Sequence, residues 1–280
     1  MSDASIKDTL LSERYGEQHK PAEIIWNPQI ENLLSHRSVR RFTAQPLPEH
    51  WFATLVAAAQ SASTSSNLQQ WSVVAVTDPQ LKAQVRKLSS GADGLANGYI
   101  DEAPAILLWV ADLSRNHTMT TADGLTPEAH DYLDALVIGT VDAALAAQNA
   151  TIAAESLGLG TVYIGATRNK AKELAALINL PEHSYVVCGL VVGWPDAADA
   201  GSIRPRLAQQ VVAHHNRYDA ANLDENVQHY EETFLAFRNA QGMKGKTWKQ
   251  AVQSSATSMA YMDGRQHLRS TLEERGFKLK

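Results

Sequence analysis

The apolar residues of this chain recur at two spacings, one typical of helices and one typical of strands. Helical spacing is found over 24–34, 49–62, 79–88 and 169–178, and again from residue 223 onward. Short apolar runs rich in β-branched residues predict strands at 71–77, 105–111, 161–164 and 185–192. The polar stretch 116–126 has neither spacing and is predicted to form a surface loop or lid. The alternation of element types predicts an α/β or α+β protein.

The longest helical pattern runs over 128–157 and ends at Gly158, a residue that tolerates the left-handed conformation of a helix cap. Small side chains fill the faces that large apolar residues leave, so this helix is apolar on most sides. It is therefore either the spine of a large domain or a surface that packs against a second subunit. Further along, Tyr230, Phe234 and Phe237 form one aromatic stripe, which is typical of an arm that wraps a partner subunit.

Composition narrows the class of protein. With 280 residues, 44% of them hydrophobic, the chain can bury a sizeable core, and disorder is excluded for most of it. The longest apolar run is far shorter than the ~20 residues of a membrane span, and no secretory signal is visible. The net charge of -5 argues against a nucleic-acid binder, and the single cysteine, Cys188, fits a reducing cytoplasm. We expect a cytoplasmic protein with neither membrane nor nucleic acid as partner.

Two basic segments have the chemistry to hold an anionic ligand. In the run that begins at His36, an extended backbone puts His36, Ser38 and Arg40 on one face across ~13 Å. That spacing suits a phosphate at one end of a ligand and a polar ring at the other. Proline separates Arg204 from Arg206 and restricts the backbone, so that both guanidinium groups can fork onto a phosphate. The alternative interpretation is a solvated basic stretch and a surface turn.

A dense row of hydroxyl and amide side chains covers 63–71, between a predicted helix and a predicted strand. It offers hydrogen bonds to an uncharged polar ligand, or it caps its own loop. The motifs of serine hydrolases, zinc proteases, paired-cysteine sites and phosphate loops are missing from the sequence. Hydrolysis through a nucleophile or a metal therefore has little support, and no metal site is expected.

An ordered set of motifs then gives a family resemblance. The segments that carry it are His36–Phe42, Ser65–Trp71, Tyr99–Pro104, Val141–Asn149, Ala153–Gly165, Leu190–Pro195 and Arg204–Arg206. In this order they resemble the FMN-dependent nitroreductase family, in its group of oxygen-insensitive NADPH nitroreductases and NADPH:FMN oxidoreductases. The resemblance implies an α+β nitroreductase-like fold, with a central mixed or antiparallel sheet flanked by helices. It also implies a single domain over 1–280, with a core at about 24–215 and a C-terminal helical arm at about 219–280 that embraces a dimer partner.

The resemblance assigns the FMN phosphate to His36, Arg204 and Arg206, with Ser38 beside the phosphate and ribityl chain. Arg40 is placed against the N1/O2 edge of the isoalloxazine, where a guanidinium stabilises the negative charge of reduced flavin. The other residues implied on the same subunit are Arg37, Asn97, Tyr163, Ile164, Gly165 and Ala166. Among these, the Gly165 amide is expected at flavin N5, and Asn97 replaces a family glutamine that reads the pyrimidine ring.

A second group of implied cofactor contacts comes from the other subunit, and it comprises Thr64, Ser65, Ser66 and Asn67, together with Gln69 on the same loop. The complete site therefore implies a homodimer. Family members use no catalytic side chain for hydride transfer, because the flavin carries out both half-reactions at one site, first with NADPH and then with an oxidised acceptor.

For the nucleotide donor, Arg238 and Lys244 stand at the spacing of family residues near the NADPH phosphates. Arg265 resembles an acceptor-pocket arginine, although Gln266 replaces the proline that follows it in the family. The ammonium group of Lys244 is a point charge and cannot bind a phosphate with two parallel hydrogen bonds as an arginine does. The preference for NADPH over NADH therefore stays open. Scattered surface charges on helices are the alternative for this arm.

We therefore expect an FMN-containing NAD(P)H oxidoreductase, with NADPH as donor, that reduces nitroaromatics, quinones or free flavins in a ping-pong reaction. Two alternatives remain from the sequence: a flavin reductase that supplies reduced FMN to a partner monooxygenase, and a non-catalytic FMN-binding redox sensor.

Overall fold

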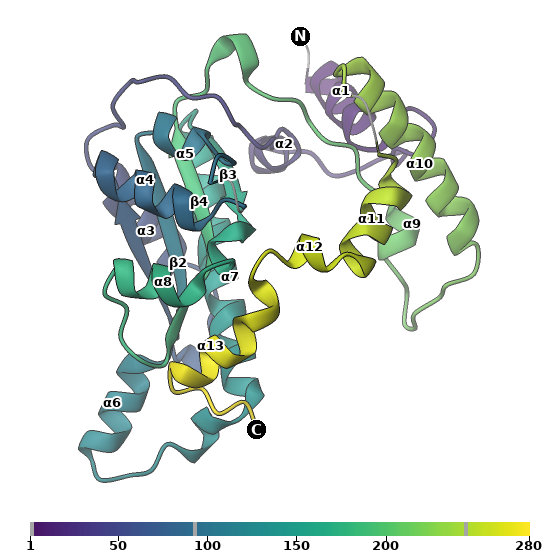
Figure 1. The fold of residues 1–280 in the computed structure, drawn as a ribbon. Helices are drawn as coiled ribbons and strands as arrows, with labels where there is room; N and C mark the ends of the chain where they lie inside the picture. Colours follow the sequence, from purple (N-terminus) through teal and green to yellow (C-terminus); the bar gives the residue numbers. More distant parts are fainter. Residues whose placement is uncertain (1–2, 92–93, 244–245) are drawn as a thin grey trace. The chain divides into compact units, whose positions relative to one another are not determined.

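A computed structural model describes residues 3–91, 94–243 and 246–280. The chain divides into two compact units (Figure 1). The helical unit combines Met1–Arg37 with Ser202–Tyr261, and the sheet unit combines Ser38–Gly201 with Met262–Lys280. The predicted single domain, with its core at 24–215 and its arm at 219–280, stays a prediction.

The sheet unit is built on four strands, β1 (Trp71–Val76), β2 (Ala105–Asp112), β3 (Gly160–Ile164) and β4 (Ser184–Gly193). Their order is β1-β2-β4-β3, and every neighbouring pair is antiparallel. All eight residues of β2 are buried, because this strand lies inside the sheet and is covered on both faces. The predicted α+β class is confirmed, with an antiparallel sheet.

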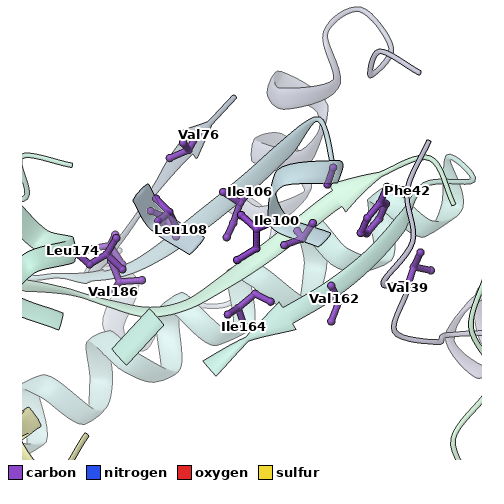
Figure 2. Packing of buried hydrophobic residues seen from close by; sticks show 14 residues of the cluster. Val39, Phe42, Val76, Ile100, Ile106, Leu108, Val162, Ile164, Leu174 and Val186 are labelled. Carbon is purple, nitrogen blue, oxygen red and sulfur yellow. The ribbon is translucent and has the colours of Figure 1, made fainter. Parts of the chain in front are cut away.

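Helices cover both faces of this sheet (Figure 1). On one face lie α3 (Trp51–Gln60) and α7 (Leu133–Ser156), whose buried Leu55 and Ala146 pack with Trp109 of β2. On the other face lie α4 (Pro79–Leu88), α5 (Tyr99–Glu102) and α8 (Ala171–Leu177). Figure 2 shows the core beneath them, in which Ile100 and Leu174 meet the side chains of β2.

Helix α7 has two different faces. Most of its alanines are buried against the sheet and α3, which explains why small residues dominate it. On its open side Leu133, Val137, Val141 and Leu145 stand four residues apart and are 44–52% exposed. By length and composition this helix is also apolar enough to cross a membrane. These four residues form an apolar stripe that winds gradually around the open side, while the opposite side of the helix is buried in the core.

The remaining elements of the sheet unit are short. They are η1 (Ser65–Asn67), α6 (Ser114–Ala122), η2 (Glu128–Asp131), η3 (Gly165–Arg168), η4 (Ala197–Asp199), η5 (Arg265–His267) and α13 (Leu268–Glu274). The last of these brings Phe277 back into the core, where it is 1% exposed and packs edge-on against Tyr185.

The helical unit contains α1 (Asp3–Tyr15), α2 (Pro28–Leu34), α9 (Gln209–Val212), α10 (Leu223–Ala240) and α11 (Trp248–Thr257). The short helix α12 (Met259–Met262) follows α11. Tyr230 of α10 is buried, with its ring 5.1 Å from that of Trp248 and 5.9 Å from that of Phe234. The predicted aromatic stripe therefore forms part of the packing of this unit.

Four sequence expectations differ from the structure, and the first is the helix predicted over 128–157, which begins only at Leu133 after the short helix η2. The stretch 116–126 is not irregular, since helix α6 occupies Ser114–Ala122. The predicted helix at 24–34 begins only at Pro28, because the side chain of Asn27 caps it by accepting from the Ile30 amide at 2.9 Å. The sequence pattern did not indicate helix α1 at all.

Candidate functional site

The residues expected at the FMN phosphate gather around one buried arginine of the helical unit. Arg14 is 6% exposed, and its Nη2 donates to the carbonyls of Leu34 and His36 at 2.8 and 2.9 Å. Its Nη1 donates to the carbonyl of Arg204 at 3.0 Å, and its own carbonyl accepts from the Arg206 amide at 2.7 Å. One side chain thus joins the two basic segments, which are far apart in the sequence.

Arg206 itself is exposed and lines a cavity of about 490 Å³ within the helical unit. Tyr15, Tyr230 and Trp248 are among the other residues that line this cavity. Burial raises the pKa of Tyr230, and the positive charges of Arg206 and Arg204 partly oppose that shift. Arg206 is thus an exposed residue on the wall of a cavity that aromatic side chains also line.

In the sheet unit, Ser38 and Arg40 flank a buried residue. The Val39 amide donates to the carbonyl of Thr161 at 2.9 Å, and Val39 is 2% exposed. It packs directly on Gly160, where an added Cβ would lie 2.7 Å from Val39 Cγ2. Because neighbouring side chains alternate along an extended backbone, Ser38 and Arg40 point away from this packed side. The burial of Val39 and the exposure of Arg40 are consistent with this alternation.

Arg40 belongs to a hydrogen-bonded chain with the predicted pyrimidine reader. Its side chain hydrogen-bonds that of Tyr99, and the Tyr99 hydroxyl donates to Asn97 Oδ1 at 2.7 Å. Asn97 in turn donates from Nδ2 to the carbonyl of Ser89 at 2.6 Å, and it has a left-handed φ of 58°. Burial raises the pKa of the Tyr99 phenol, whereas Arg40 acts to lower it. Tyr99 thus keeps its proton. Its hydroxyl links Arg40 to Asn97, two residues whose connection the sequence did not indicate.

The loop that carries Thr64 to Gln69 has an unusual backbone. Ser66, Asn67 and Gln69 all have positive φ, between 48° and 57°, although none of them is glycine. Such residues cost of order 1 kcal/mol or more each, so surrounding contacts must hold the loop. The buried carboxylate of Asp142 supplies two of these contacts, because it accepts from the Ser65 amide at 3.1 Å and from the Gln70 amide at 3.2 Å.

Helix α6 holds the same loop from its other side. Arg115 donates to the carbonyls of Gln69 and Trp71 at 2.7 and 2.8 Å, and Asn116 donates to the carbonyl of Leu68 at 3.2 Å. The carboxylate of Asp112, 2.7 Å from Arg115, fixes the guanidinium. The loop, α3 and α6 together line a groove of about 610 Å³. With their backbone held from both sides, the side chains from Ser65 to Gln69 are exposed.

The segment after β3 carries the residues that the resemblance places beside the flavin ring. Ile164 is buried, and Gly165 is exposed at the first position of η3. The first amides of a helix have no partner within it, so η3 itself leaves the Gly165 amide without an acceptor. Ala166 is half-buried. Tyr163 is 37% exposed and not in the core, and Thr151 hydrogen-bonds its hydroxyl at 2.9 Å.

One buried polar atom tests whether these residues fit FMN. The Oγ1 of Thr64 is buried and has no hydrogen-bond partner among the residues that the structure describes. Buried hydroxyls without partners are rare, and such an atom indicates a missing ligand or water. Together with the exposed amides and hydroxyls of its loop, it fits an uncharged, hydrogen-bonding part of a flavin. The residues present therefore fit the implied cofactor.

The residues expected near NADPH lie in different units. Arg238 is in the helical unit, where its guanidinium lies 5.8 Å from the ring centre of Phe234. Arg265 is half-buried at the start of η5 in the sheet unit. The prediction for Lys244 falls outside the described residues. These three assignments stay predictions.

The sequence reasoning missed the residues that support the site. Arg14, Tyr99, Asp142 and Arg115 act on segments remote in the chain, or through backbone atoms, and such contacts leave no spacing pattern. Tyr99 and Asp142 do lie inside motifs that carry the family resemblance. Arg14 lies outside all of them.

The fold defines the class of protein. It is an α+β protein with a nitroreductase-like fold, in which helices lie on both sides of an antiparallel sheet. Residues 33–194 match the family model described as the nitroreductase family, and residues 204–280 match that of the family's C-terminal domain. The chain belongs to the nitroreductase family. The resemblance seen in the sequence is therefore confirmed.

Individual relatives are similar in sequence to most of the chain. It is 35% identical over 263 residues to the FMN reductase (NAD(P)H) of Bacillus subtilis, covering 90% of this chain and 99% of the relative. It is 35% identical over 253 residues to the NADPH-flavin oxidoreductase of Vibrio harveyi, covering 89% and 98%.

Solved structures are similar over the same extent. A hypothetical oxidoreductase from Bacillus subtilis superposes with a TM-score of 0.83 at 35% identity, covering 91% of this chain and 100% of that chain. The NADPH:FMN oxidoreductase from Vibrio harveyi, complexed with NAD+, gives a TM-score of 0.78 at 34% identity, covering 91% and 100%.

Proposed function

We propose that this protein is an FMN-containing NAD(P)H oxidoreductase, with NADPH as the preferred donor, that works as a homodimer in the cytoplasm. Its acceptors are nitroaromatics, quinones or free flavins, reduced in a ping-pong reaction. The names of its relatives, an FMN reductase and an NADPH-flavin oxidoreductase, support flavin chemistry. The observation that carries the proposal is the gathering of His36, Arg204 and Arg206 around Arg14.

The chain's own residues bind and orient. Arg204 and Arg206 offer a fork to the phosphate, and His36 adds a further donor. Arg40, held by Tyr99, presents a fixed positive charge to the ring edge where negative charge develops on reduction. The amide of Gly165 donates to the reacting edge of the ring. Bound FMN supplies the transfer of two electrons and a proton between NAD(P)H and the acceptor.

The open stripe of α7 supports the proposed dimer. Leu133, Val137, Val141 and Leu145 form an apolar row on a helix whose opposite side is buried in the core. Rows of this kind are typical of interfaces between subunits. The occupant we propose is a second copy of this chain, because the loop from Thr64 to Gln69 presents its side chains outward and so can serve a cofactor held by another subunit.

Binding of FMN to the purified protein, followed by quenching of flavin fluorescence, tests the proposal. Wild-type protein should bind FMN stoichiometrically. Replacing Arg206 by alanine removes a charge-assisted bond worth about 1.5–3 kcal/mol, which corresponds to about a tenfold to hundredfold weaker Kd. Arg217→Ala, an exposed arginine of the same unit, is the matched control and should bind as the wild type does. Equal affinities in all three proteins would remove Arg206 from the site.

A further inference from the structure

We propose that Arg14 of helix α1 is a positioning residue for the phosphate-binding segments, and that α1 is an addition of this chain to the site. The inference rests on the proposed FMN function. Both matched family regions, 33–194 and 204–280, exclude α1. Helix α1 is nevertheless hydrogen-bonded through Arg14 to Leu34, His36 and Arg204, which lie inside those regions.

The geometry of Arg14 explains the role. Its guanidinium reaches three carbonyls, two on the segment that ends at His36 and one at Arg204. The planar fork holds its donors in fixed directions, so both segments are held at a set separation. A backbone bond from the Arg206 amide to the Arg14 carbonyl adds a second link to the same segment. Arg14 therefore links the backbone of His36 directly to that of Arg204 and Arg206.

Because Arg14 is buried, the loss of its hydrogen bonds would cost much free energy, and the bonds hold the two segments rigidly. Arg14 is 6% exposed, so its charge is largely removed from water and needs all three acceptors. The carbonyls likewise require a donor when they are screened from water. Neutral or shorter side chains at this position cannot satisfy the two segments together. Phosphate binding needs the segments in register, because a fork that is displaced by about 1 Å loses most of its benefit.

The experiment compares FMN with riboflavin, which has the same ring and ribityl chain but no phosphate. Kd values for both are measured by fluorescence quenching for wild type, Arg14→Met, Arg14→Lys and the control Lys20→Met. Lys20 follows α1 in the same unit and pairs with Asp8 and Glu17 at the surface. Thermal unfolding of each protein accompanies the binding data.

For Arg14→Met, we expect the Kd for FMN to rise at least tenfold and the Kd for riboflavin to stay within twofold of the wild-type value. Arg14→Lys keeps the charge but not the fork, so its Kd for FMN should lie between those of wild type and Arg14→Met. Lys20→Met should leave both values unchanged. If Arg14→Met does not fold, Arg14→Lys decides the question through the same comparison.

Two results would overturn the inference. One is an unchanged Kd for FMN in both Arg14 variants, and the other is an equal loss for FMN and riboflavin, which would indicate general destabilisation. A failure of the proposed function looks different, because wild-type protein itself would then bind neither flavin.

Discussion

Replacing Asp142 by asparagine should loosen the loop from Ser65 to Gln70 without disrupting the sheet. The carboxylate accepts two backbone bonds, from the amides of Ser65 and Gln70 at 3.1 and 3.2 Å. Asparagine keeps one acceptor oxygen and turns an amino group toward the other amide, so one bond is lost and one donor faces another donor. Hydrogen bonds to a charged group contribute about 1.5–3 kcal/mol each. We therefore expect the free energy of unfolding to fall by about 2–3 kcal/mol.

The local effect should exceed the global one. Three residues of this loop have left-handed φ angles, so they favour other conformations once the carboxylate is gone. Hydrogen exchange at the Ser65 and Gln70 amides should accelerate by more than the loss of global stability explains. Urea unfolding monitored by tryptophan fluorescence gives the global value, and exchange measured by mass spectrometry or NMR gives the local one.

Thr140→Val is the matched control for this experiment. Thr140 lies on the same helix, and its hydroxyl is 2.7 Å from that of Tyr185, away from the loop. This variant should lose stability without selective exchange at the loop amides. Wild-type exchange rates at Ser65 and Gln70 in Asp142→Asn would refute the reasoning, and so would identical local effects in both variants.

Three further outcomes follow from the sheet unit. Gly160→Ala places a Cβ 2.7 Å from Val39 Cγ2, so unfolding measurements should show a loss of about 1–3 kcal/mol, whereas an unchanged midpoint would mean that Val39 shifts freely. Burial lowers the pKa of His183 and of His130, so the unfolded state binds protons first as the pH falls. The free energy of unfolding should therefore decrease below about pH 6.5. A urea midpoint that stays constant from pH 7.5 to 5.5 would contradict this. Val141→Glu places a charge on the open stripe of α7 and should shift the protein toward monomer in sedimentation velocity, and a persistent dimer would argue against this interface.

The sequence predicted those features of the fold that depend on local pattern. Period-two alternation separates Val39 from Ser38 and Arg40, and in the structure Val39 is buried whereas Arg40 is exposed. The four strands were predicted to within one residue at each end, since each is a compact apolar run. The family resemblance added the chemical roles, which no periodicity contains.

What the sequence did not reveal depends on contacts between distant segments. Helix α6 is polar and lacks an apolar face, and Arg115 and Asn116 attach it to the neighbouring loop through backbone carbonyls. Arg14 acts in the same way over 190 positions of sequence. Backbone carbonyls are present at every residue, so neither partner of such a bond stands out in a one-dimensional pattern.

The most direct test of the central claim is the visible absorption spectrum of the protein loaded with FMN, recorded anaerobically during the addition of NADPH and, separately, of NADH. We expect flavin bands at ~370 and ~450 nm, bleaching of the ~450 nm band by NADPH at lower concentrations than by NADH, and recovery on addition of a quinone or nitroaromatic. Bound flavin that neither nucleotide bleaches would contradict the proposed oxidoreductase activity and favour a redox sensor. Protein that takes up no FMN at all would contradict the site itself.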